Sequence, residues 1–470
     1  MTDIAALKAR LPSIRIEDHP TLVRQKSRDF FWYSPVLKRQ LDHITADCVV
    51  FAKSAADVAA TLAACYDLDI PVTPRGTGTG NYGQAMPLSR GVVLDLSLMD
   101  KVLKIEPGVL VAEAGAVMAE IDSRTQAHSG QELRMHPSTA KTATIGGFVA
   151  GGSGGVGSIT WGGLRDWGNV TRLKVVTMEA SPRVLDLTGE DLQKVSHAYG
   201  TNGIITEVEM PLTTAFEWVD VIIGFDTLTE AAAFANETGE ADGILKKQLA
   251  VVAAPAAHDY FNRHRRWIPR DKHIVCAMIA PQNYDAFLTL TRRRRGAELL
   301  FSTSGLSEAD RKGLPDIYEL GWNHTTLRAL KIDPTITYLQ VLYPFPNQLE
   351  LVTEIHARFG DELPAHLEFV RFDGKVTCFG LPLVKFTTEE RLDEIIRIHE
   401  EMGAPVFNPH RYTLEEGGMK QTDALQLAFK READPKGLLN PGKMISWDDP
   451  NYDYTSSRTY LFRGMQMEET

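Results

Sequence analysis

The first residues whose spacing suits chemistry form a glycine loop. Residues 78–83, Gly-Thr-Gly-Asn-Tyr-Gly, match G-x-G-x-x-G and follow an expected strand at residues 70–73. In a nicotinamide-binding fold, this loop opens directly into a helix whose N-terminus receives the diphosphate. Here only residues 84–90, including Pro87, separate the loop from the next expected strand at 91–96. The spacing therefore argues against that fold.

The loop can still bind a diphosphate through its own backbone. Successive N–H groups in a glycine-rich turn form an anion-binding nest. Residues 74–80, Pro-Arg-Gly-Thr-Gly-Thr-Gly, supply such amides and two hydroxyl donors. We therefore predict a phosphate-binding loop here; a flexible surface turn is the alternative.

A second glycine-rich stretch lies at residues 146–168. Ten of these 23 residues are glycine, which removes side chains where a ligand must approach the backbone closely. The two stretches together predict a phosphate nest and a slot with a glycine floor.

These stretches resemble the flavin domain of the vanillyl-alcohol-oxidase/PCMH superfamily. Residues 70–80 resemble its P-x-x-P-R-G-x-G-T-G pyrophosphate loop, and residues 91–97 resemble the strand that follows it. Other motifs that resemble the family are Pro137 with residues 144–147, Trp161-Gly162, residues 200–206 (Gly-Thr-Asn-Gly-Ile-Ile-Thr) and residues 439–443 (Leu-Asn-Pro-Gly-Lys). The last resembles the closing motif of the subgroup of glycolate-oxidase subunits and D-lactate dehydrogenases. The resemblance covers about residues 40–212 and 430–445, and is diffuse between 216 and 400.

The resemblance implies an α+β protein that binds FAD. It implies a bipartite PCMH-type FAD-binding domain and an α+β cap of antiparallel sheet and helices. We expect the FAD domain at residues 1–215, with an N-terminal extension at 1–40, the cap at 216–425, and a returning segment at 426–470. The diphosphate would lie on residues 75–80, and the ring and ribityl chain against residues 144–158. The implied cofactor residues are Pro74, Arg75, Gly76, Thr77, Gly78, Thr79, Gly80, Asn81, Pro137, Thr144, Gly146, Gly147, Gly151, Gly154, Ser158, Gly203, Ile205 and Asn440.

We expect the FAD to be held non-covalently. In some relatives a histidine of the first loop bonds to the flavin, and Thr79 takes that place here. Residues 136–168 contain no cysteine that could make the second type of link.

A flavin dehydrogenase also needs a base for the substrate proton and a group that positions the substrate. Residues 403–418 occupy the place where 2-hydroxy-acid dehydrogenases have G-E-H-G, and His410 is the nearest match to that histidine. Arg411 is suited to hold a carboxylate. His324, which follows Trp322-Asn323, and Tyr338 are further candidates in the cap. Structural roles are the alternative for His410, His324 and Tyr338, and a solvent-facing side chain for Arg411.

No metal site is predicted. The G-D-x-N-x-H motif of many 2-hydroxy-acid relatives is not reproduced at residues 366–374. His366 and Glu368 have the spacing to share a strand face, but two ligands do not close a site.

Composition narrows the functional class of the protein further. The 470 residues carry a net charge of −11, which disfavours a nucleic-acid partner despite the run Arg292–Arg295. Four cysteines without C-x-x-C pairing indicate buried free thiols. No signal peptide and no apolar run of 18 residues is visible, so we expect a cytoplasmic protein. A homodimer is one assembly compatible with the sequence.

Several elements are expected from local patterns. Ser54 caps a helix at 55–67, a hairpin spans 102–112, and a helix spans 191–196. Residues 335–342 and 368–379 each read as a strand.

The leading hypothesis is an FAD-dependent dehydrogenase or oxidase of a small hydroxylated substrate, best a 2-hydroxy acid, that passes its electrons to an unknown acceptor. A phenolic or aromatic alcohol is the alternative substrate, supported by the aromatic clusters and the missing metal motif. A redox-neutral enzyme like the alkyl-glycerone-phosphate synthases and a non-catalytic subunit rank below these.

Overall fold

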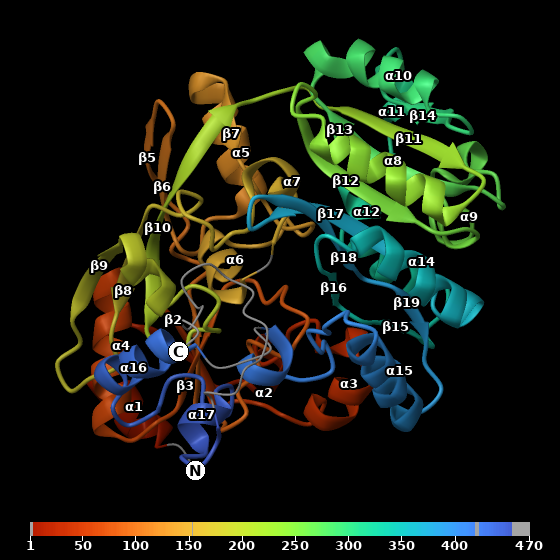
Figure 1. Cartoon of the computed structure of the whole chain (residues 1–470). Coiled ribbons are helices and arrows are strands. Elements are labelled where there is room, and N and C mark those ends of the chain that lie inside the picture. Colours follow the sequence, from red (N-terminus) through yellow and green to blue (C-terminus); the bar gives the residue numbers. More distant parts are fainter. Residues whose placement is uncertain (1–2, 153, 419–422, 454–470) are drawn as a thin grey trace, which may run out of the picture. The chain divides into compact units, whose positions relative to one another are not determined.

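The computed structural model describes residues 3–152, 154–418 and 423–453, which form two compact units (Figure 1). Unit 1 comprises residues 1–153, 164–215 and 409–470, and unit 2 comprises residues 154–163 and 216–408. One unit boundary falls at 215/216, and the chain returns to unit 1 at Pro409, ahead of residue 426. The three functional domains proposed from the sequence stay a proposal. Among the described residues, no helix is both long and apolar enough to cross a membrane.

Unit 1 contains a small sheet of order β1-β2-β4-β3, in which β2, β4 and β3 run parallel. The central strands are short apolar runs buried on both faces, as is usual in parallel sheets. Helix α4 connects β2 to β3 and begins where Ser54 Oγ accepts the N–H of Asp57 at 3.1 Å, as expected. The bounds are β1 (Arg15–Glu17), β2 (Cys48–Phe51), α4 (Ala55–Asp67), β3 (Val72–Arg75) and β4 (Val92–Asp95).

The second sheet of unit 1 has the order β5-β6-β10-β8-β9, with β7 also paired to β10. The expected hairpin β5–β6 is confirmed and turns at Gly108, whose φ is +77°. The bounds are β5 (Val102–Glu106), β6 (Val109–Glu113), β7 (Gln131–Leu133), β8 (Arg172–Val176), β9 (Val184–Thr188) and β10 (Ile204–Thr214).

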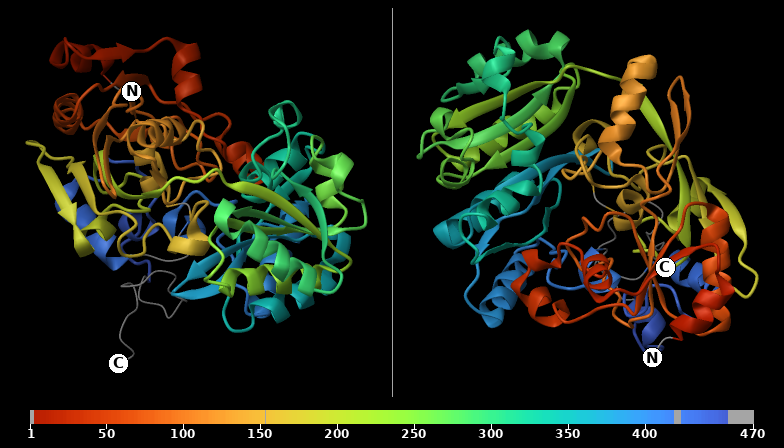
Figure 2. Two further views of the ribbon diagram at one scale, coloured as in Figure 1. Left: turned by 90° about the horizontal axis from the view of Figure 1, so that it is seen from above. Right: turned by 180° about the vertical axis from the view of Figure 1, so that it is seen from behind.

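Helices and the C-terminal segment complete unit 1. The C-terminal elements (blue) lie among the N-terminal and central elements of this unit (Figure 2), and Leu439 bridges to Val72 of β3. The bounds are α1 (Ile4–Arg10), α2 (Pro20–Lys26), η1 (Phe31–Tyr33), α3 (Pro35–Leu41), α5 (Met118–Ser129), α6 (Ile145–Gly151), η2 (Gly189–Lys194), η6 (Leu414–Gly418), α16 (Ala424–Ala433) and α17 (Ile445–Asp448).

Unit 2 is built on an antiparallel sheet of order β14-β11-β13-β12-β17-β18-β16. Helices α8 and α14 pack together on one face (Figure 1). Helix α12 packs on the other, where Gly321 leaves room for Ala250 and Cys276. The strands are β11 (Val219–Phe225), β12 (Lys246–Val252), β13 (His273–Ile279), β14 (Glu298–Ser302), β16 (Val341–Tyr343), β17 (His366–Phe372) and β18 (Lys375–Gly380), with a separate pair β15 (Ile336–Tyr338) and β19 (Leu383–Lys385).

The helices of unit 2 include short 3-10 turns between the strands. Their bounds are α7 (Ser158–Trp161), α8 (Leu228–Glu240), α9 (Ala256–Tyr260), η3 (Arg265–Trp267), η4 (Pro281–Asn283), α10 (Tyr284–Arg293), α11 (Glu308–Arg311), α12 (Tyr318–Gly321), α13 (His324–Leu330), α14 (Gln348–Phe359), η5 (Gly360–Glu362) and α15 (Glu389–Glu401).

Some local expectations were wrong. The single strand expected at 368–379 is the hairpin β17–β18, because Asp373 and Gly374 both adopt positive φ and form a two-residue turn. The strand at 335–342 is divided between β15 and β16, which belong to different sheets. The expected helix at 191–196 is the 3-10 turn η2. The four cysteines are buried and free, as expected.

Candidate functional site

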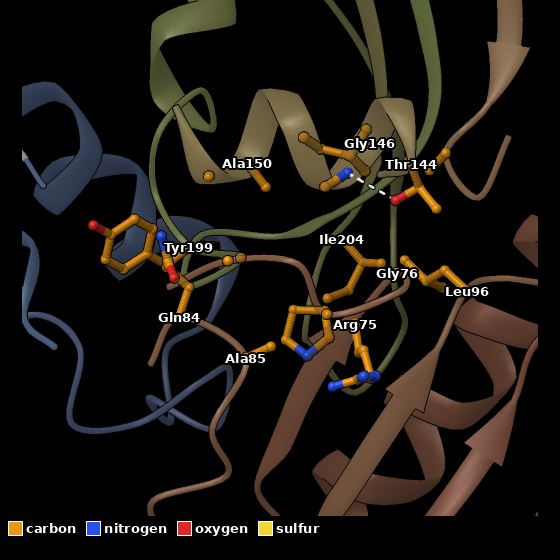
Figure 3. A pocket seen from close by; sticks show the side chains of 18 of the residues that line it. Arg75, Gly76, Gln84, Ala85, Leu96, Thr144, Gly146, Ala150, Tyr199 and Ile204 are labelled. Atoms are coloured by element: carbon orange, nitrogen blue, oxygen red, sulfur yellow. Dashed lines mark hydrogen bonds between the residues drawn. The ribbon is translucent and has the colours of Figure 1, made fainter. Parts of the chain in front are cut away.

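A pocket in unit 1 is enclosed by three chain segments that are far apart in the sequence. Residues 74–85, 144–151 and 195–205 supply most of its lining (Figure 3). Helix α6, with Gly146 and Ala150, borders one side, and Arg75 and Ala85 lie on the opposite side. About 830 Å³ of space lies within it, part of it open to solvent.

The first segment is the glycine loop that follows β3. Gly78 has a φ of +75°, and an added Cβ would lie 2.2 Å from Nη2 of Arg75. The buried Arg75 donates to the carbonyl of Thr77 at 2.8 Å and to that of Arg28, so its guanidinium supports the loop from behind. Burial lowers the pKa of Arg75, an effect opposed by Asp29 and Asp95. Glycine is therefore required at position 78 because the backbone is left-handed there and because a Cβ would lie too close to Arg75.

The second segment begins at Thr144, whose Oγ1 accepts the N–H of Gly147 at 3.3 Å and so caps α6 (Figure 3). It also touches the first loop, because a Cβ on Gly76 would lie 2.1 Å from Thr144 Oγ1. A Cβ on Gly146 would lie 2.6 Å from that of Ala114, just after β6. Helix α6 was not expected from the sequence, since its glycines disfavour helix formation.

The third segment runs from Val195 into β10. Tyr199 and Gly200 both adopt positive φ, and a Cβ on Gly200 would lie 2.3 Å from Cγ of Pro74. Burial raises the pKa of the Tyr199 phenol, and Tyr199 lines the pocket beside Gln84 (Figure 3). The glycine at 200 thus lets this segment approach the first loop.

The pocket brings together most of the residues assigned to the cofactor. Those that line it are Pro74, Arg75, Gly76, Thr77, Gly78, Thr79, Gly80, Thr144, Gly146, Gly147, Gly151, Gly203 and Ile205. The lining also includes residues that the sequence analysis did not name individually as cofactor residues: Gln84, Ala85, Leu96, Ala114, Ala150, Val195, Tyr199, Gly200 and Ile204. Leu96 directly follows strand β4, and Ala114 directly follows strand β6. Their positions at strand ends were the sequence signal that could have identified them as lining residues.

The remaining assigned residues lie elsewhere. Asn81 and Pro137 belong to unit 1 outside the lining, whereas Gly154 and Ser158 belong to unit 2. Ser158 Oγ donates to the carbonyl of Gly154 at 2.6 Å. The expectation that residues 144–158 form one flavin-facing stretch therefore spans two units.

Asn440 lies behind the pocket. Its side-chain Nδ2 donates to the carbonyl of Gln84 at 2.8 Å and to that of Tyr199 at 2.7 Å. Because both of these residues line the pocket, Asn440 joins the first and third segments.

The residues around the pocket fit FAD. A dinucleotide needs close backbone approach, and the glycines at 76, 78, 146 and 200 are positions that a side chain would obstruct. The buried Nε of Arg75 has no hydrogen-bond partner among the described residues, which suits an anionic ligand nearby.

The catalytic candidates of unit 1 are His410 and Arg411. His410 is buried, and its Nδ1 lies 2.7 Å from Oγ of Ser34. That oxygen also accepts the N–H of Leu37 and so caps α3. Arg411 is half-buried, with Nε 4.0 Å from a carboxylate oxygen of Glu416.

The candidates of unit 2 are His324, which directly follows a residue of a buried polar cluster, and Tyr338. His324 begins α13 and Tyr338 is buried on β15. On β17, Glu368 accepts the N–H of Asn323 at 2.6 Å, and burial raises the pKa of Glu368 to about 8. Nε2 of His366 lies 3.9 Å from this carboxylate, and burial lowers the pKa of His366 to about 4. Within the described part of the chain, no three His, Cys, Asp or Glu side chains are grouped as metal ligands.

Comparison with known proteins identifies the first unit. Residues 46–186 match the model of a family described as FAD binding domain. D-lactate dehydrogenase of Archaeoglobus fulgidus is 24% identical over 430 residues, covering 84% of this chain and 91% of the relative. Glycolate oxidase subunit GlcD of Bacillus subtilis is 24% identical over 446 residues, covering 86% and 89%. GlcD of Escherichia coli is 30% identical over 224 residues, 46% of this chain and 44% of the relative.

The fold is also known from solved structures. A structure of alkyldihydroxyacetonephosphate synthase superposes with a TM-score of 0.69 at 17% identity, covering 93% of this chain and 85% of that one. At this identity the likeness shows the fold alone. Together with the glycine-lined pocket, the family match shows that the chain contains an FAD-binding domain and that its cofactor is FAD.

Proposed function

We propose that the protein is an FAD-dependent dehydrogenase or oxidase that oxidises the CH–OH group of a 2-hydroxy acid. The main support is that two relatives matching more than four-fifths of the chain are named for D-lactate and glycolate. FAD, when bound, supplies the acceptor for the substrate hydride at N5. The protein must then supply a proton acceptor and a group that recognises the carboxylate.

His410 is the proposed proton acceptor. If Ser34 Oγ accepts a hydrogen from Nδ1, the other ring nitrogen, Nε2, carries the lone pair that a base requires. If Ser34 donates instead, Nε2 carries the hydrogen and the histidine is structural. The same contact with Ser34 fixes the ring in both cases, so activity measurements must separate the roles. Arg411, His324 and Tyr338 stay candidates for holding the substrate.

The substrate class is tested by adding candidate substrates to the FAD-loaded protein without oxygen. We expect D-lactate, glycolate or D-2-hydroxyglutarate to bleach the flavin absorbance, with L-lactate and L-2-hydroxyglutarate as matched controls for the two chiral substrates. Bleaching by an aromatic alcohol alone would replace the proposed substrate with the phenolic alternative. A redox-neutral enzyme would show no lasting bleaching with either class. Repeating the assay with oxygen and with an artificial acceptor separates an oxidase from a dehydrogenase.

We also propose that FAD is dissociable, because Thr79 lines the pocket where some relatives carry a linking histidine. After acid precipitation the flavin should remain in the supernatant. A yellow pellet with a colourless supernatant would contradict this.

A further inference from the structure

Three charged side chains are buried behind the first glycine loop. Arg75 is 8% exposed, Asp29 is 3% exposed and Lys443 is fully buried. They come from β3, from the link between α2 and η1, and from the C-terminal segment before α17. All three belong to unit 1. Buried charges of this kind must be balanced by one another or by a ligand.

Lys443 supports the loop without a carboxylate of its own. Its Nζ donates to the carbonyl of Gly83 at 2.6 Å and lies 5.0 Å from the centre of the Tyr412 ring. Within the described residues it forms no ion pair within 4.0 Å. Lys430 offers a contrast on the same segment, because its Nζ lies 2.8 Å from the buried carboxylate of Asp434.

Asp29 holds the same stretch from the other side. One carboxylate oxygen accepts the N–H of Phe31 at 2.9 Å, and the other accepts the N–H of Ala85 at 3.1 Å. Ala85 lines the pocket and Gly83 lies two residues before it. Asp29 and Lys443 therefore fix two residues of one short stretch, Ala85 and Gly83, at the edge of the pocket.

The charges around the loop do not balance. Asp29 is the acidic group whose field acts on Lys443, and it also acts on Arg75. The other carboxylate that acts on Arg75 is Asp95, which already pairs with Lys26 at 2.7 Å. Three cations thus face two carboxylates. Burial lowers the pKa of Lys443 to about 7 and raises that of Asp29 to about 6, as expected for charges lacking full compensation.

We propose that Lys443, Asp29 and Arg75 form a buried charge set that is completed by the diphosphate of FAD, so that cofactor binding is coupled to protonation of Lys443. The proposal rests on the diphosphate lying at residues 75–80. Lys443 acts through the carbonyl of Gly83 and the field of its charge, and is a positioning residue.

The direction of the pH effect follows from this arrangement. Without FAD, Lys443 loses its proton as the pH rises through about 7. A diphosphate nearby favours the ammonium form and raises that pKa in the complex. Above pH 7 the protein must therefore take up a proton when FAD binds, and affinity falls with rising pH by at most about tenfold per unit. The charged or titratable groups facing Lys443 are Asp29 and Tyr412, and Arg75 faces Asp29.

The test is the dissociation constant of FAD, measured on apo-protein by quenching of flavin fluorescence from about pH 6.5 to about pH 9. We expect FAD to bind more weakly as the pH rises, whereas riboflavin, which lacks the diphosphate, should show no such slope. A flat profile for FAD would overturn the proposal. An equal slope for both ligands would also overturn it, because the effect would not involve the diphosphate.

Variants assign the slope to Lys443. Lys443→Met should weaken FAD binding by about tenfold near pH 6.5 and remove the slope. In Lys443→Arg the side chain stays charged over this pH range. This variant should therefore show no slope and should still bind FAD well at about pH 9. Lys430→Met, a matched loss of a buried lysine with its own carboxylate, should reduce stability but keep the slope. A slope that persists in Lys443→Met would refute the assignment.

A calorimetric measurement needs no variant and so does not depend on the folding of Lys443→Met. FAD is titrated into wild-type apo-protein at about pH 8 in buffers of different ionisation enthalpy. We expect net uptake of up to one proton per FAD. Absence of uptake would contradict the proposal even if every variant failed to fold.

Discussion

At the scale of single residues, Gly78 combines a left-handed backbone with a lack of room for a Cβ beside the guanidinium of Arg75. Gly78→Ala should strain the loop by about 1–3 kcal/mol and displace the guanidinium. We expect FAD binding to weaken by roughly tenfold or more in a fluorescence titration. Gly108→Ala is the matched control, since Gly108 has a similar φ of +77° but no neighbour within 4 Å. Equal affinity in both variants would mean that the loop does not hold the cofactor.

Enzyme kinetics can test whether His410 acts as the base or has a structural role. If His410 is the base, His410→Gln should lower kcat by about 10²–10⁴-fold and should change the unfolding temperature little. Ser34→Ala tests the contact with Nδ1 and should reduce kcat less. A variant that loses stability but keeps kcat would identify a structural histidine.

At the scale of elements, the short helix α6 depends on its cap. Thr144→Ala removes the acceptor for the N–H of Gly147 and should destabilise the helix by about 1 kcal/mol. Because α6 lines the pocket, we expect FAD affinity to fall several-fold. Thr227→Ala removes the equivalent cap of α8 in unit 2, where Thr227 Oγ1 accepts the N–H of Glu230 at 3.2 Å. The two variants should lose similar stability, measured by thermal unfolding, but only the first should lose cofactor affinity.

The elements show what local sequence can and cannot predict. Helix α4 was predictable because Ser54 caps a run of good helix formers, and the β5–β6 hairpin because Pro107-Gly108 marks its turn. Helix α6 was not predictable, since its sequence has a poor helix propensity and its stability comes from tertiary packing against residues such as Ala114. The turn at residues 373–374 carried an Asp-Gly signal that the expected long strand overlooked.

At the scale of the molecule, a buried ion pair holds distant segments of unit 1 together. Nη2 of Arg165 lies 2.9 Å from a carboxylate oxygen of Asp423, and both side chains are buried. Arg165→Met leaves a buried carboxylate without its partner and should cost about 3–5 kcal/mol in urea unfolding. Arg397→Met breaks the exposed pair with Glu401 and should cost at most about 1 kcal/mol. Similar losses in the two variants would contradict a structural role for the buried pair.

The candidate site was predictable where a motif lies within one short segment. The first loop and Thr144 were assigned from sequence, and they line one pocket. Tyr199 was not, because its place beside Gln84 depends on how three distant segments meet. Asn440 was assigned to the cofactor, but its side chain reaches two carbonyl groups behind the lining. Sequence identifies such residues without stating whether they touch the ligand or hold what touches it.

The position of Asn440 has a consequence for biosynthesis. Its backbone N–H donates to the carbonyl of Val72, and its side chain ties Gln84 to Tyr199. A nascent chain on the ribosome therefore lacks this tie until residue 440 has been synthesised. Fragments that stop before residue 440 should therefore retain FAD poorly.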